Sequence, residues 1–177
     1  MTSNTIETVR CLMGGEWVDA QAEERGTVWN PSTGEVIAQV PLCGKEDVHR
    51  VVGRAGEAFR KWADTPPPDR ARFLFRFREI LVKETEDLAR IVSREHGKTH
   101  KEAKAEIQRG IDVVEFACGI PSHSMGETMR NVAPGIDCET FRYPLGVTVG
   151  ITPFNFPAMI PLWMAPVAIA CGNCFVL

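Results

Sequence analysis

The residues best suited to chemistry lie in an uncharged stretch, residues 146–177, which contains no Lys, Arg, Asp or Glu. Within it, the loop TPFNFP at residues 152–157 separates two apolar runs. A neutral amide such as Asn155 can donate a hydrogen bond to a developing oxyanion without titrating, and one such donor contributes on the order of 3 kcal/mol in a transition state. The same side chain could instead cap the helix expected after the loop. The residue pattern leaves both interpretations open.

Arg109 is a second candidate. The apolar spacing predicts a helix over residues 99–117, and Arg109 lies on the side opposite its main stripe, in line with Phe116. Val113 also lies near that side, so the C-terminal half of the helix is expected to be covered on both faces. A guanidinium there needs water or an anion, because burying it unpaired is costly. The helix pattern alone favours a salt bridge; the alternative is an anchor for a substrate carboxylate.

The cysteines and histidines do not form a recognisable reactive or metal-binding pattern. Six cysteines without a signal peptide predict reduced thiols and a cytoplasmic protein. Cys171 and Cys174 lie between an apolar helix and an apolar strand, with no neighbouring cation to lower a thiol pKa, so we expect them to pack in the core. The four histidines are scattered, and no metal site is predicted.

The elements that must position Asn155 follow from the pattern around it. Residues 146–151 and 174–177 are short apolar runs, and residues 158–170 form a helix-length run between them. This order predicts strand, loop, helix and strand, a βαβ unit of a parallel sheet covered on both faces. Pro157 is expected to be the first helical residue. Because ligands bind outside the carboxyl ends of parallel strands, the loop is where we expect a ligand.

A membrane span is the competing interpretation of the uncharged stretch, since it exceeds the roughly 20 residues that a bilayer requires. Several prolines interrupt it, namely Pro153, Pro157, Pro161 and Pro166. Each proline removes a backbone donor, and lipid cannot satisfy the carbonyl left open. We therefore expect a buried core and no contact with a membrane.

The preceding chain predicts a hairpin and helices. Residues 12–41 suggest antiparallel strands, residues 45–62 a helix, and residues 69–97 one long amphipathic helix whose Arg and Lys side chains face solvent. Residues 121–137 read as a connector and 138–143 as an extended run. The net charge of −3 and the lack of a basic patch exclude a nucleic-acid partner.

These patterns divide the chain into three parts: a hairpin and helical part (1–124), a connector with an extended run (125–145), and the βαβ unit (146–177). The final apolar run stops in mid-strand, so we expect an N-terminal part of a longer protein. A buried parallel strand needs neighbours on both sides, and these 177 residues are therefore expected to fold incompletely or to depend on missing partners.

Specific motifs resemble the NAD(P)-dependent aldehyde dehydrogenase superfamily. They are Gly150–Pro157, Trp163, Ala165-Pro166 and Gly172-Asn173. Phe154 replaces the Trp usual in that family. Residues 109–117 and 141–147 are similar to the CoA-acylating methylmalonate-semialdehyde dehydrogenase branch. The resemblance implies an α/β fold in which the N-terminal hairpin and helices lead into the first βαβ unit of a Rossmann-type parallel sheet, with the catalytic domain absent from these residues.

The resemblance also implies a mechanism. A cysteine thiolate attacks the semialdehyde, the Asn155 amide holds the oxyanion, and a hydride passes to NAD. Loss of CO2 and transfer of the acyl group to coenzyme A then give propionyl-CoA or acetyl-CoA. The nucleophilic cysteine lies beyond Leu177, so these residues alone are expected to be inactive. The alternatives are a general non-acylating NAD(P)-dependent aldehyde dehydrogenase and a non-catalytic paralogue of the same fold.

The remaining roles are also implied only by the resemblance. Thr152 and Phe154 match positions that contact NAD, and Phe156 and Trp163 match walls of the substrate pocket. Arg109 matches the arginine that binds the substrate carboxylate, which reverses the preference for a salt bridge. Residues 126–144 resemble the start of oligomerisation strands, so a homo-oligomer, commonly a tetramer, is expected.

Overall fold

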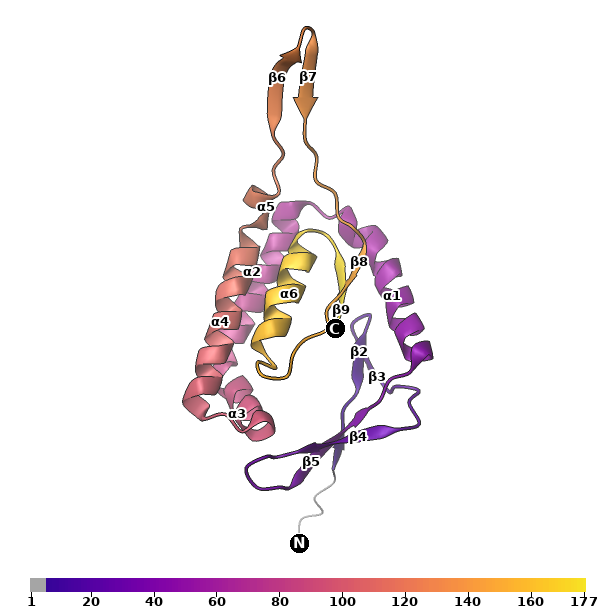
Figure 1. The fold of residues 1–177 in the computed structure, drawn as a ribbon, viewed down its shortest axis with the longest axis vertical. Coiled ribbons are helices and arrows are strands. Elements are labelled where there is room, and N and C mark those ends of the chain that lie inside the picture. The colour runs from indigo at the N-terminus through magenta and orange to yellow at the C-terminus, as the bar shows by residue number, and fades with distance from the viewer. Residues whose placement is uncertain (1–5) are drawn as a thin grey trace.

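The computed structural model describes residues 6–177, which form a mixed α/β structure (Figure 1). The helices are α1 (Lys45–Ala63), α2 (Pro67–Lys83), α3 (Thr85–His96), α4 (His100–Cys118), α5 (Ile120–His123) and α6 (Met159–Ala170). The strands are β1 (Glu7–Thr8), β2 (Cys11–Met13), β3 (Glu16–Val18), β4 (Arg25–Trp29), β5 (Val36–Pro41), β6 (Thr128–Ala133), β7 (Ile136–Glu139), β8 (Val147–Val149) and β9 (Cys174–Val176).

The N-terminal strands confirm the predicted antiparallel part. β2 pairs with β3 around Gly14 and Gly15, whose φ angles of 63° and 86° suit a tight turn without a side chain. β4 pairs antiparallel with β5, and β1 adds a parallel partner on the other edge of β5. The turn between β4 and β5 ends at Gly34, with φ of 75°.

The predicted helix over residues 69–97 is wrong in one respect, because it is two helices. Glu84 ends α2 and precedes α3, with φ of −92° and ψ of 7°. The break lets α3 turn against α4, where Ala89 and Val92 are buried beside Ile107. Packing against α4 therefore overrides a continuous helical pattern. Gly97 ends α3 in the left-handed conformation, in which glycine is commonly found after a helix.

The core lies along α4. A capping box formed by Thr99 and Glu102 starts this helix, which confirms its predicted N-terminus. The buried apolar side chains of α4 are the predicted stripe of Ile107, Ile111, Val114 and Cys118, together with Ala103 and Ala117. The opposite side is open, because Phe116 is 54% exposed and Arg109 is exposed. The expectation that both faces are covered does not hold in this structure.

The predicted connector contains regular structure. α5 follows α4 directly, and β6 and β7 form an antiparallel hairpin that projects from one end of the molecule (Figure 1). The extended run expected at 138–143 instead ends at Glu139 as part of β7. Residues on both faces of this hairpin are exposed, so no other element within residues 6–177 covers it.

The uncharged stretch has the predicted order of strand, loop, helix and strand. β8 pairs parallel with β9, with Val147 opposite Cys174 and Val149 opposite Val176, and α6 makes the crossover. α6 begins at Met159 rather than at Pro157. It packs on α4 and α2, while β9 lies against α1 (Figure 1). No helix within residues 6–177 combines the length and apolar composition needed to cross a membrane.

Candidate functional site

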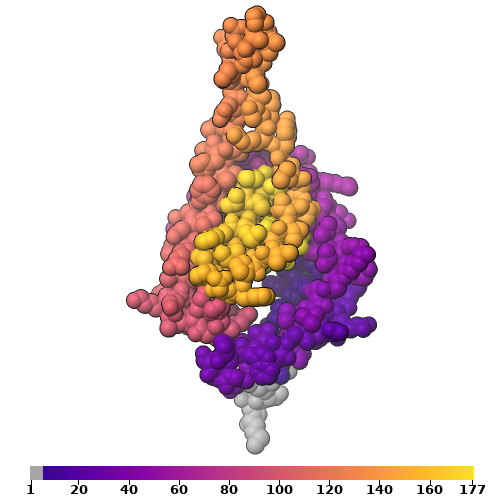
Figure 2. All heavy atoms as spheres, viewed as in Figure 1, coloured from indigo at the N-terminus to yellow at the C-terminus, as the bar shows by residue number. Residues whose placement is uncertain are grey.

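The loop between β8 and α6 lies at the surface, at the carboxyl end of β8 (Figures 1 and 2). A hollow of about 450 Å³ beside it is lined by Pro31, Glu95, His96, Phe154, Asn155 and Pro157. The Phe154 side chain is 92% exposed, Asn155 is exposed, and Thr152 is half-buried. The loop thus offers an aromatic ring and an amide to a ligand in the place that the parallel pair predicts.

The N-terminus of α6 is held by a carboxylate from α4. Glu106 is 1% exposed, and its Oε1 accepts hydrogen bonds from the backbone N–H groups of Ala158 at 2.9 Å and Met159 at 3.2 Å. These donors belong to the helix terminus, where a negative charge is favourable. Asn155 therefore does not cap α6, since Glu106 takes that role and the residue before Met159 makes no side-chain cap.

Lys98 links Glu106 to the loop. Its Nζ donates to Glu106 Oε2 at 2.5 Å and to the backbone carbonyl of Asn155 at 2.6 Å. The same ammonium lies 4.1 Å from the ring centroid of Phe156, a cation–π contact. Burial alone would raise the pKa of the Glu106 carboxyl, but the Lys98 ammonium and the two backbone N–H groups more than offset it and lower that pKa. The Glu106 carboxyl is therefore ionised at neutral pH.

Arg109 and Trp163 flank a close contact between α4 and α6. A Cβ added at Gly110 would lie 2.5 Å from Leu162 Cδ1 and 3.1 Å from its Cβ, so a larger residue there would require Leu162 to shift. Arg109 precedes Gly110, and Trp163, which is 43% exposed, follows Leu162. Within residues 6–177 Arg109 has no salt-bridge partner, so the ion pair favoured by the helix pattern is not formed there.

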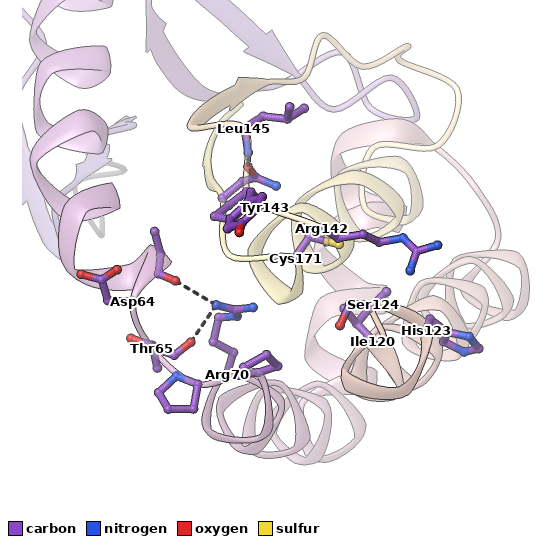
Figure 3. A pocket seen from close by; sticks show the side chains of 15 residues that line it. Asp64, Thr65, Arg70, Ile120, His123, Ser124, Arg142, Tyr143, Leu145 and Cys171 are labelled. Carbon is purple, nitrogen blue, oxygen red and sulfur yellow. Dashed lines mark hydrogen bonds between the residues drawn. The ribbon is translucent and has the colours of Figure 1, made fainter. Parts of the chain in front are cut away.

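A larger cavity, of about 670 Å³, lies at the other end of α6 (Figure 3). Arg70 at its wall is 6% exposed, so the expectation that the basic residues of α2 all face solvent is wrong for this residue. Its Nε donates to the Ala170 carbonyl at 3.0 Å, and its Nη1 donates to the Thr65 carbonyl at 2.7 Å. These carbonyls end α6 and follow α1, so the Arg70 charge stabilises helix termini.

The cysteines lack the setting of a nucleophile. All six are free, and Cys171 and Cys174 are half-buried rather than fully packed in the core. The expectation of no neighbouring cation is wrong for Cys171, because the Arg70 guanidinium lies near it at the wall of the same cavity. Burial raises the pKa of the Cys174 and Cys118 thiols, and it also raises that of Cys43 beside Cys11. Within the described part of the chain, no group of three or more His, Cys, Asp or Glu side chains could hold a metal ion.

Sequence reasoning did not single out Lys98, Glu106 or Arg70. The available signal was Glu106, a carboxylate that sits in the buried stripe of α4 between Ala103 and Ile107. A charged group on a core face must have a partner, because an unpaired buried charge is costly. Nothing local to Glu106 indicates that its partners are Lys98 and the start of α6.

The parallel β8–β9 pair and the exposed loop after β8 define a segment of an α/β protein, a class in which ligands generally bind at the carboxyl ends of strands. Residues 17–177 match the model of the aldehyde dehydrogenase family. The chain belongs to this family, as the motifs around Asn155 predicted.

Within this family, the chain is similar to curated malonate-semialdehyde dehydrogenases. The chain is 50% identical over 177 residues to malonate-semialdehyde dehydrogenase 2 of Oceanobacillus iheyensis, covering 100% of this chain and 36% of that protein. It is 51% identical over 172 residues to malonate-semialdehyde dehydrogenase 1 of Geobacillus thermodenitrificans, covering 97% and 36%. The chain thus spans about a third of the length of these relatives.

Solved structures show the same arrangement. The crystal structure of methylmalonate-semialdehyde dehydrogenase from Oceanimonas doudoroffii superposes with a TM-score of 0.94 at 46% identity, over 97% of this chain and 35% of that one. A putative methylmalonate-semialdehyde dehydrogenase from Sinorhizobium meliloti, complexed with NAD, superposes with a TM-score of 0.93 at 42% identity, over 96% and 35%. The chain has the α/β fold of the N-terminal part of these enzymes.

Proposed function

We propose that this chain is the N-terminal part of an NAD-dependent, CoA-acylating dehydrogenase. The enzyme would oxidise malonate semialdehyde or methylmalonate semialdehyde, with loss of CO2, to acetyl-CoA or propionyl-CoA. The observation that carries the proposal is 50% identity along the whole chain to a malonate-semialdehyde dehydrogenase. The proposal includes coenzyme A because residues 109–117 and 141–147 resemble the CoA-acylating branch of the family.

Asn155 is proposed to act on the reacting carbonyl. Its side chain lines the hollow beside the loop, and its amide N–H would donate to the carbonyl oxygen as negative charge develops there. The proposal gains support from Glu106, because the helix N-terminus that Asn155 could have capped is already satisfied. The amide is left available for a ligand.

The substrate residues are proposed to lie where α4 and α6 meet. Arg109 would bind the carboxylate of the semialdehyde through its fork of N–H donors. Its exposure and its lack of an ion pair within residues 6–177 support this role. Phe156 and Trp163 would form apolar walls of the pocket and exclude water from the reacting group.

The residues present fit one edge of a nicotinamide cofactor. NAD, when bound, accepts the hydride released by the substrate. Thr152 supplies a hydroxyl and Phe154 an exposed ring at the carboxyl end of β8, where dinucleotides bind in open α/β sheets. We propose that β8, α6 and β9 are the first βαβ unit of this Rossmann-type sheet, a role that their parallel pairing supports.

The oligomer and the compartment are further proposals. Met129, Val132 and Ile136 are exposed on the β6–β7 hairpin, and a hairpin uncovered on both faces is suited to pairing with a second copy in a homo-oligomer such as a tetramer. Six free cysteines agree with the reducing cytoplasm.

The test uses the full-length enzyme with malonate semialdehyde, NAD and CoA. We expect NADH and an acyl-CoA product in equal amounts, with turnover that depends on CoA. Accumulation of the free acid at a rate independent of CoA would instead identify a non-acylating aldehyde dehydrogenase, and no NADH at all would identify a non-catalytic paralogue.

The variant Arg109→Ala tests the substrate class. It should lower kcat/KM for malonate semialdehyde by about 10²-fold while sparing propanal, because a bidentate charged contact contributes about 3 kcal/mol. Arg94→Ala, which removes an exposed arginine of α3, is the matched control and should leave both substrates unaffected. Equal losses on both substrates would return Arg109 to a structural role.

A further inference from the structure

We propose that Lys98 and Glu106 position the oxyanion donor Asn155, although neither side chain touches the reacting atoms. The inference rests on the proposed function, in which the Asn155 amide holds the carbonyl oxygen. It assigns to a buried ion pair the task of fixing the loop backbone from which that amide projects.

The first support is how completely Glu106 is used. One carboxylate oxygen accepts from the N–H groups of Ala158 and Met159, and the other accepts from Lys98. The residue is 1% exposed, and the Lys98 side chain is 15% exposed. This carboxylate therefore joins Lys98, in the connector before α4, to the start of α6, where the loop ends.

The second support is the reach of Lys98. An ammonium has three donors, and one contacts Glu106 while another contacts the Asn155 carbonyl. The Phe156 ring lies against the same ammonium. Lys98 thus holds the backbone of the proposed oxyanion donor and the ring of the neighbouring pocket residue at one point.

The third support is that Lys98 is itself fixed. It follows Gly97, whose φ of 83° sets a tight turn, and a Cβ at Gly97 would meet Pro31 Cγ at 2.9 Å. It precedes Thr99, whose backbone N–H donates to Glu102 Oε2 at 3.1 Å in the capping box of α4. The turn on one side and the capping box on the other therefore fix the backbone from which the Lys98 ammonium extends.

Stability alone gives a poor reason for this arrangement. A buried ion pair loses about as much in desolvation as it gains by attraction, and an apolar replacement is often as stable. Geometry gives a better reason, because a misplacement of about 1 Å at a reacting group can cost roughly 10² in rate. Removing the Lys98 ammonium should let the Asn155 backbone move while leaving Arg109 in place.

The experiment is a double-mutant cycle in the full-length enzyme, with NADH formation followed in a single turnover. Lys98→Met should slow the acylation step about 10- to 10²-fold, with KM for the semialdehyde nearly unchanged. In the Asn155→Ala background the same substitution should change the rate by no more than about threefold, because the group that Lys98 positions is gone.

Matched variants separate positioning from folding. Lys104→Met breaks the exposed ion pair between Lys104 of α4 and Glu86 of α3 and should leave the rate unchanged. Lys98→Arg keeps the charge and should restore part of the rate. If Lys98→Met does not fold, Glu106→Gln takes its place in the cycle, because a glutamine oxygen can still accept from the start of α6.

The outcomes are distinct. An equal loss from Lys98→Met in both backgrounds means that Lys98 acts independently of Asn155 and overturns this inference alone. A normal rate for Asn155→Ala removes the proposed role of that amide, and the inference falls with it. A loss confined to the background that retains Asn155 establishes the positioning role.

Discussion

The two ends of α6 are held by buried side chains of opposite charge. At the N-terminus, the Glu106 carboxylate accepts from the first backbone N–H groups. At the C-terminus, the Arg70 guanidinium donates to the Ala170 carbonyl. Each charge is opposite in sign to the partial charge of the helix terminus that it contacts. The same electrostatic rule therefore fixes both ends of one helix.

The ends differ in what lies beyond the charge. Glu106 continues through Lys98 to an exposed loop that faces a hollow. Arg70 makes its hydrogen bonds to backbone carbonyls of Ala63, Thr65 and Ala170. The first arrangement orders a segment that is available to a ligand, and the second closes helix ends against each other. Substitutions at the N-terminal end should therefore change rates, and those at the C-terminal end should change stability.

The largest effect is expected from Asn155→Ala in the full-length enzyme. The acylation rate should fall roughly 10²- to 10³-fold, because one oxyanion donor is lost. The midpoint of thermal unfolding should stay within a degree or two, since the exposed side chain does not cap α6. Gln108→Ala, which removes an exposed amide of α4, is the control and should leave the rate unchanged. A near-normal rate for Asn155→Ala would contradict the expectation that the N-terminal end of α6 controls the rate.

Arg70→Met should give the converse result. We expect the free energy of unfolding to fall by about 2–4 kcal/mol, because buried carbonyls lose their donor and each such loss costs about 1–3 kcal/mol. Denaturant unfolding measures this, and kcat should change less than twofold in the folded variant. Arg72→Met removes an exposed arginine two residues further along α2, paired with Asp69, and should cost well under 1 kcal/mol. A fall in kcat at full stability would place Arg70 in the site instead.

Glu86→Gln changes a charged residue that lies at neither end of α6, and it serves as the reference for the variants at the two ends. Hydrogen bonds from Lys104 and His100 lower the pKa of the exposed Glu86 carboxyl from 4.5 to about 2. Its contribution to stability is therefore complete above pH 4.5 and is lost as the pH falls toward 2. The difference in unfolding midpoint between wild type and variant should be small at pH 7 and vanish in acid. A difference that grows in acid would contradict the sign of this pKa shift.

Local sequence patterns were sufficient to predict most of the fold near the loop. Apolar runs separated by turn residues predicted β8, the loop, α6 and β9 in order. The spacing of Ile107, Ile111 and Val114 predicted the buried face of α4. The errors lie where packing between elements decides. Glu84 interrupts a continuous helical pattern because α3 turns onto α4, and Arg70 is buried because two helix ends converge on it.

By itself the sequence determined the order of elements around Asn155 and the family to which the chain belongs, because both depend on residues that are neighbours along the chain. Only the tertiary structure decided which groups hold that loop. Lys98 and Asn155 are 57 positions apart, and Glu106 and Met159 are 53 apart. These partners meet because Gly110 lets α4 approach Leu162 of α6 closely, and that approach places a buried carboxylate at the helix N-terminus it stabilises.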